Sequence, residues 1–122
     1  MKFCTAINCI DGRVQLPVIE YLKERFGVDY VDCVTEAGED LIMSEHKPER
    51  VEATLRCVRI SIEKHGSKQI AIAGHHDCAG NPVPKEKHIE QIIEAAQFLK
   101  TQFPNTEIIG LWIDENWKAN EV

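Results

Sequence analysis

The sequence predicts a single-domain α/β fold, in which a mainly parallel sheet of about four strands carries helices on both faces. Apolar runs with strand character alternate along the chain with segments whose apolar residues recur at helical spacing. The chain has 122 residues, a length typical of one domain with one core. Neither an internal repeat nor a linker divides it, so we expect residues 1–122 to form one unit.

The first part of the chain predicts a strand, a helix and a second strand. Residues 2–9 form an apolar run that a turn ends. Residues 15–26 have apolar positions at helical spacing, with Pro17 expected in the first turn and Gly27 as the stop. Residues 28–34 are expected to form the second strand, near an exposed edge.

The middle of the chain predicts a loop, a helix and the third strand. Residues 35–47 lack periodicity and are expected to form a loop, with at most a helical turn at residues 41–43. Pro48 occupies a favourable first-turn position of a helix that ends at Gly66. Residues 69–74 are continuously apolar after the first position and predict a buried strand.

The last part predicts the longest helix and a closing strand. Residues 85–103 are amphipathic, and Pro104 ends that segment. The face expected to be buried consists of Ile89, Ile92, Ile93, Ala96, Leu99 and Phe103. Residues 106–113 predict the fourth strand, and residues 114–122 are expected to form a polar tail.

A strand order of 2-1-3-4 would place the ligand site between the first and third strands. In an open parallel sheet the site lies at the carboxyl ends of the strands, where neighbouring connections leave in opposite directions. Cys9 lies at the carboxyl end of the first strand, and His75 and Cys78 lie at that of the third. Together they predict a three-ligand Zn²⁺ site with a fourth position left for water, which is the arrangement of a catalytic site.

Two motifs in this order resemble the beta-class carbonic anhydrases. The first is Cys-x-Asp-x-Arg and the second is Gly-His-x-x-Cys, carried here by Cys9, Asp11, Arg13, Gly74, His75 and Cys78. Ala37-Gly38 matches the middle loop of that family, and residues 109–114 resemble its closing strand. The chain is thus identified as a compact, divergent member.

The resemblance implies a lyase, a carbonate dehydratase, that hydrates carbon dioxide to bicarbonate with a zinc-bound hydroxide. It implies a homodimer or higher homo-oligomer with the active site near the subunit interface. It also gives Asp11 and Arg13 catalytic roles. Paired with Arg13, Asp11 leaves the metal open to water; released, Asp11 becomes a fourth zinc ligand and closes the site.

Departures from the family pattern keep other functions open. Thr35-Glu36 stands where the family usually has Arg-Asn, in the loop expected to line the pocket. One alternative is hydrolysis of carbonyl sulfide or carbon disulfide at the same zinc. Another is a non-catalytic zinc-binding protein in which Asp11 closes the metal shell. A thiol redox function fits poorly, because Cys9 and Cys78 belong to no Cys-x-x-Cys pair.

Composition argues against nucleic-acid and membrane partners. A net charge of −6 with interleaved acids and bases argues against nucleic acid. No apolar run is long enough for a membrane span, and the amino terminus lacks signal-peptide features, so we expect a cytoplasmic protein. The odd number of cysteines fits reduced thiols, with Cys4, Cys33 and Cys57 expected in the core. His88 is expected to be solvated.

Overall fold

The computed structural model describes residues 1–122 and contains a five-stranded sheet in the order β2-β1-β3-β4-β5. Its parallel strands are β1 (Phe3–Asn8), β2 (Tyr30–Thr35), β3 (Gln69–His75) and β4 (Glu107–Ile113). The short strand β5 (Ala119–Glu121) runs antiparallel to β4. The predicted α/β class and the order 2-1-3-4 are therefore confirmed, with one strand added at the β4 edge.

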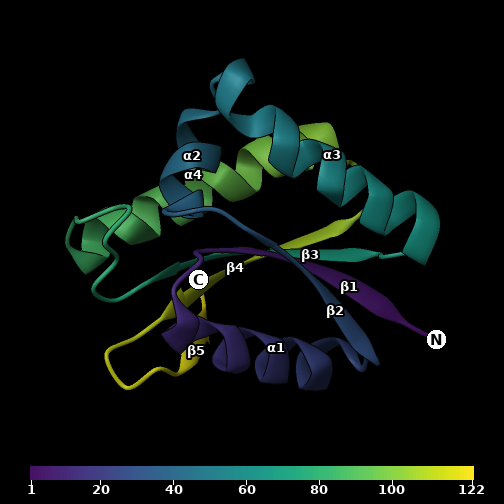
Figure 1. Cartoon of the computed structure of the whole chain (residues 1–122), viewed down its shortest axis with the longest axis horizontal. Coiled ribbons are helices and arrows are strands. Elements are labelled where there is room, and N and C mark those ends of the chain that lie inside the picture. Colours follow the sequence, from purple (N-terminus) through teal and green to yellow (C-terminus); the bar gives the residue numbers. More distant parts are fainter.

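Four helices cover the two faces of this sheet (Figure 1). Helix α1 (Gly12–Phe26) packs on one face, while α2 (Glu39–Glu45), α3 (Pro48–His65) and α4 (Lys85–Gln102) pack on the other. None of the helices is long and apolar enough to cross a membrane. The connections that leave β1 and β3 thus run to opposite faces, which creates the switch point at the carboxyl ends of these two strands.

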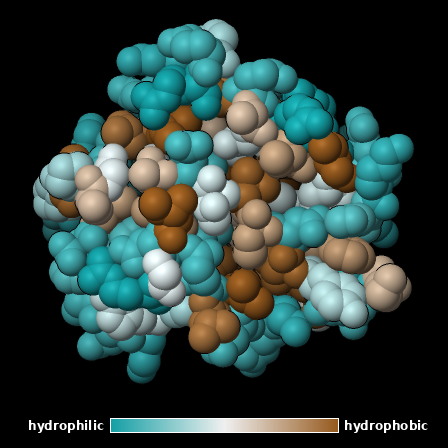
Figure 2. All heavy atoms as spheres, in the orientation of Figure 1, coloured by the Kyte–Doolittle hydropathy of each residue, from teal (hydrophilic) through white to brown (hydrophobic).

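Each face of the sheet has its own hydrophobic core. The core under α1 contains Val14, Val18 and Leu22, which meet small strand residues such as Ala71 and Ala73. The larger core lies under the other three helices and includes Ile7, Ile42, Met43, Val58, Ile70, Ile72, Ile92 and Leu99. Figure 2 shows hydrophobic residues across the middle of this view, between outer helical surfaces that are mostly hydrophilic.

Three elements differ from the sequence prediction. Helix α1 begins at Gly12, capped by Asp11, so Pro17 lies inside the helix rather than in its first turn. Residues 39–45 form the helix α2, where the sequence predicted a loop. The sequence conceals the periodicity of this helix because its buried face includes the acidic residues Glu39 and Asp40. The expected polar tail turns back after β4 and forms the strand β5.

Buried and exposed positions also differ in detail. Cys4 is buried as expected, whereas Cys33 and Cys57 are exposed. His88, expected in solvent, is fully buried on α4, and Ile93, expected in the core, is exposed. The buried stripe of α4 therefore includes polar residues that a purely hydrophobic pattern does not reveal: His88, Gln91, Ile92, Ala95 and Leu99.

Candidate metal centre

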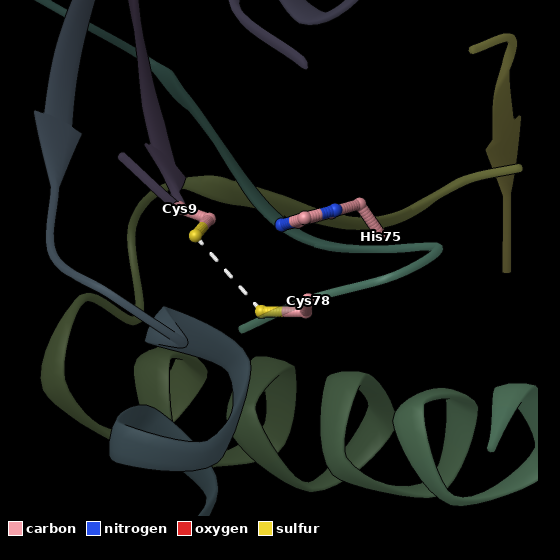
Figure 3. Close-up of side chains that lie close together, drawn as sticks. All are labelled: Cys9, His75 and Cys78. Carbon is pink, nitrogen blue, oxygen red and sulfur yellow. Dashed lines mark hydrogen bonds between the residues drawn. The ribbon is translucent and has the colours of Figure 1, made fainter. Parts of the chain in front are cut away.

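The carboxyl ends of two adjacent parallel strands bring Cys9, His75 and Cys78 together. Cys9 is the first residue after β1, His75 is the last of β3, and Cys78 lies in the loop that follows. All three are buried, and their ligand atoms lie within 4.8 Å of one another. Figure 3 shows the three side chains converging, with the imidazole of His75 directed toward the two sulfur atoms.

The imidazole of His75 offers one specific nitrogen to this group. Its Nδ1 lies 2.7 Å from the backbone oxygen of His76, to which it donates when it carries the proton. Its Nε2 is buried and has no hydrogen-bond partner. A backbone carbonyl that fixes the tautomer of a histidine in this way is typical of metal ligands. The unpartnered Nε2 lone pair is therefore available to a metal.

The two thiols have the separation that a tetrahedral zinc requires. Zinc–sulfur bonds of about 2.3 Å at a tetrahedral angle place two sulfurs about 3.8 Å apart, and Cys9 Sγ lies 3.9 Å from Cys78 Sγ. Burial, and after it the adjacent Cys9, raises the pKa of the Cys78 thiol to about 12. A cation would favour the Cys78 thiolate that burial otherwise disfavours. The donor set thus fits Zn²⁺.

Asp11 and Arg13 form a bidentate ion pair beside the three donors. Arg13 Nη2 donates to Asp11 Oδ2 at 2.7 Å, and Arg13 Nε donates to Asp11 Oδ1 at 3.1 Å. The hydrogen bonds from Arg13 lower the pKa of Asp11 to about 2, and the carboxylate raises the pKa of Arg13. Both oxygens of an ionised Asp11 are therefore engaged by the guanidinium.

Two further residues, Asp77 and Trp117, contact Arg13. The sequence predicted neither contact. The backbone oxygen of Asp77 accepts from Arg13 Nη2 at 3.2 Å, and Asp77 Oδ2 lies 3.3 Å from Nη1. The indole ring of Trp117 lies under the guanidinium, with Arg13 Cζ 4.5 Å from the ring centroid. Trp117 comes from the turn between β4 and β5, so the predicted polar tail concealed this contact.

Gln15 fixes the backbone between β1 and α1. Its Nε2 donates to the backbone oxygens of Cys9 and Asp11, at 2.8 Å in each case. The side chain of Asn8 donates to Gln15 Oε1 at 2.9 Å. The loop that carries both a metal donor and the carboxylate is therefore held by side-chain hydrogen bonds, a role that no motif in the sequence indicated.

A buried polar cluster supports the loop that carries Cys78. Asn81 donates to Asp40 Oδ1 at 3.1 Å and to Gln91 Oε1 at 2.7 Å. His88 Nδ1 lies 2.5 Å from Asp40 Oδ2. These side chains join α2 and α4 to the loop after β3. Sequence reasoning missed this cluster, because its members are separated in the chain and polar.

Comparisons with known proteins give the same family and fold. A family model described as "Putative carbonic anhydrase" matches residues 1–122. A carbonic anhydrase from Streptococcus mutans has 19% identity and a TM-score of 0.67, with 97% of this chain and 80% of that chain covered. A carbonic anhydrase from Glaciozyma antarctica has 20% identity and a TM-score of 0.63, with 96% and 80% covered.

The beta-carbonic anhydrase isoform I of Trichomonas vaginalis is also similar, with 17% identity, a TM-score of 0.64, and 96% of this chain and 80% of that chain covered. No curated protein sequence matches the chain. At these identities the solved structures show the fold, while the family model covers every residue. The chain is therefore a divergent member of the beta-carbonic anhydrase family.

Proposed function

We propose that the chain binds Zn²⁺ through Cys9, His75 and Cys78 and hydrates carbon dioxide to bicarbonate. The observation that carries this proposal is the buried, unpartnered Nε2 of His75 facing two thiols, beside a carboxylate already paired with Arg13. Three soft donors are one fewer than a closed structural zinc site uses. The pairing of Asp11 with Arg13 leaves the fourth position to a water molecule.

Each residue of the site has a separate part in this function. Zinc held there would supply the Lewis acidity that ionises water near neutral pH. Asp11 stays ionised, since its pKa lies near 2, and serves as a hydrogen-bond acceptor beside the metal. Arg13 holds both oxygens of Asp11 and so prevents it from becoming a fourth ligand. The substrate is a small molecule.

We also propose that the chain self-associates near this site as a homodimer or higher homo-oligomer. Ile10, between Cys9 and Asp11, is 63% exposed, and Leu16 on α1 is 66% exposed. A contiguous exposed apolar patch rimmed by polar residues is typical of protein interfaces, and we propose that Ile10 and Leu16 belong to one. Burial of Ile10 by a second copy would also restrict access of solvent to the adjacent Cys9.

Stopped-flow measurement of carbon dioxide hydration with a pH indicator tests the catalytic proposal. The zinc-loaded protein is expected to exceed the buffer rate at pH 8.5, and Cys78→Ser is expected to lose the activity together with the metal. Cys57→Ser is the matched control, because Cys57 is exposed on α3, outside the donor group, and its loss should change neither.

The outcome separates hydration from the alternatives. A zinc-loaded wild type that is no faster than buffer would contradict carbon dioxide hydration. Turnover of carbonyl sulfide or carbon disulfide by that same protein would then identify the hydrolase. Bound zinc without turnover of any of these substrates would identify a non-catalytic zinc protein, in which Asp11 closes the metal shell.

A further inference from the structure

We propose that Trp117 is a positioning residue of this site, whose indole face holds the Arg13 guanidinium in the orientation that pairs with Asp11. The consequence for turnover rests on the proposed function, because the pair affects catalysis only if Asp11 competes with water for a metal. The positioning itself is a property of the fold. It joins the hairpin between β4 and β5 to the loop after β1.

The guanidinium of Arg13 makes hydrogen bonds to two aspartates and a cation–π contact with Trp117. The carboxylate of Asp11 accepts from Nε at 3.1 Å and from Nη2 at 2.7 Å. The carboxylate of Asp77 accepts from Nη1 at 3.3 Å, and its backbone oxygen accepts from Nη2 at 3.2 Å. Arg13 Cζ lies over the indole ring of Trp117, 4.5 Å from the ring centroid. This separation is within the range of a favourable cation–π contact. Three partners therefore define the position of a side chain that is 46% exposed.

The carboxylate of Asp77 constrains the guanidinium only weakly. It is 71% exposed and accepts from Nη1, a nitrogen that Asp11 does not use. Exposed ion pairs are weakly directional, because water screens them and the side chains keep their mobility. The contact with the indole ring differs, since it limits movement of the guanidinium away from its hydrogen-bond partners and so keeps Nε and Nη2 within reach of Asp11. Trp117 thus supplies a constraint on Arg13 that the exposed carboxylate of Asp77 does not.

The backbone of Trp117 is held in an unfavourable conformation to place this ring. Its φ is +59°, in the left-handed region that bulky residues rarely adopt. Asp114 determines the turn, since its Oδ1 accepts from the backbone N–H groups of Asn116 and Lys118 at 2.9 and 3.0 Å. The backbone N–H of Trp117 donates to the oxygen of Asp114 at 2.9 Å. Asparagine or glycine would suit this position better, so the indole serves another purpose.

Three substitutions separate the ring from the turn. Trp117→Asn suits the left-handed conformation and removes the aromatic face, whereas Trp117→Phe keeps a smaller face. Trp117→Leu removes the face but keeps apolar volume against the core under α1, and it replaces the Asn variant if that variant fails to fold. Phe26→Leu is the matched control, because it removes an arginine–aromatic contact away from Arg13. Arg25 Cζ lies over the ring of Phe26, 5.1 Å from its centroid.

The direct measurement is the rate at which the Arg13 Nε–H proton exchanges with solvent, monitored by ¹⁵N NMR. The NMR signal of this group is assigned by its absence from the spectrum of Arg13→Lys. A cation–π contact at this exposure corresponds to a factor of about two to five in a local equilibrium. Exchange should therefore be about two to five times faster in Trp117→Asn and Trp117→Leu. It should stay close to the wild-type rate in Trp117→Phe and Phe26→Leu. Equal exchange in the wild type and both ringless variants would overturn the proposal.

Replacing the metal with Co²⁺ measures how loss of the Trp117 ring affects coordination by Asp11, without requiring turnover. In Trp117→Asn, the visible spectrum of the Co²⁺-loaded protein should move in the same direction as in Arg13→Ala. The shift should disappear when Asp11→Asn is added. A spectrum that responds to Arg13→Ala but ignores Trp117→Asn would overturn the link between Trp117 and Asp11.

These measurements fail separately from the proposed function. A wild type without hydration activity would contradict carbonic anhydrase function, while Nε–H exchange would still decide the role of Trp117. An active wild type whose exchange and cobalt spectrum are unaffected by Trp117→Asn would contradict the role of Trp117 alone.

Discussion

At the residue scale, the metal centre depends on which atom each side chain presents. The carbonyl of His76 occupies Nδ1 of His75, so Nε2 is the nitrogen that faces the thiols. Arg13 occupies both oxygens of Asp11, which under the proposed function keeps this carboxylate from coordinating a metal. The motifs in the sequence indicated these residues, but the choice of atom depends on local backbone and side-chain partners.

Glu39 is a second unusual carboxyl, buried at the start of α2. Its Oε2 accepts a hydrogen bond from the hydroxyl of Thr54 at 3.0 Å, while Oε1 has no partner. Burial is the main cause that raises the pKa of Glu39 to about 8; the hydrogen bond from Thr54 opposes it, and the nearby Glu36 and Asp40 add to it. The folded protein therefore keeps this side chain neutral at a pH where the unfolded chain ionises it.

This pKa predicts that stability falls with rising pH. Between the unfolded pKa near 4.5 and the folded pKa of about 8, the folded state binds more protons, so the free energy of unfolding decreases across that interval. The loss should be on the order of 5 kcal/mol and be complete above pH 8. Urea unfolding of Glu39→Gln at several pH values should show a shallower decrease than the wild type.

The exposed Glu49 provides the control for this measurement. Glu49→Gln should retain the wild-type decrease from pH 5 to pH 8. Identical pH profiles for Glu39→Gln and the wild type would show that Glu39 titrates normally in the folded protein. Adding a chelator to every sample removes the separate pH dependence of metal binding.

At the element scale, α2 and the loop after β3 are built around close backbone contact. A Cβ on Gly38 would lie 2.7 Å from the oxygen of Gly80, and Gly38 has a φ of +71°. A side chain at Gly74 would similarly meet Asp40 and Ile92. The absence of side chains at these positions lets α2 approach the strand and loop that carry His75 and Cys78.

The side chain of Asn81 is expected to pre-organise this loop for metal. Asn81→Ala removes the hydrogen bonds of the side-chain amide and leaves Asp40 Oδ1 and Gln91 Oε1 without that donor. The free energy of unfolding should fall by about 1–3 kcal/mol, as for other buried hydrogen bonds. Competition with a chromophoric chelator should show weaker zinc binding, because Cys78 lies in the same loop.

Asn105→Ala is the control, since Asn105 is exposed in the turn before β4. It should change neither quantity. Loss of stability in Asn81→Ala with unchanged zinc affinity would show that the polar cluster supports the core and not the metal-binding loop.

The buried parallel strands could be predicted from the sequence because their apolar pattern is simple. The strand β3 is a continuous apolar run, and its neighbours β1 and β4 resemble it. The strand β5 could not be predicted, since its three residues are polar or small and depend on pairing with β4. The buried stripe of α4 shifted because His88 and Gln91 are satisfied by distant partners, which no local pattern reveals.

At the scale of the whole molecule, a small sheet brings distant sequence motifs to one edge. The parallel pairing of β1 with β3 places Cys9 beside His75, although 66 positions separate them in the sequence. Similar solved structures are longer, since this chain covers 80% of the carbonic anhydrase from Streptococcus mutans. The motifs predicted which strand ends meet. The hairpin that places Trp117 beside Arg13 could be found only in the complete fold.

Native mass spectrometry of the purified protein tests the central claim most directly, because it counts metal ions and subunits together. We predict one zinc per chain in a dimer or higher oligomer. Zinc should be absent from Cys9→Ser, His75→Ala and Cys78→Ser, and retained in Cys57→Ser. A wild type that carries no zinc after loading, or zinc retained when Cys9 and Cys78 are both replaced by serine, would contradict the metal centre.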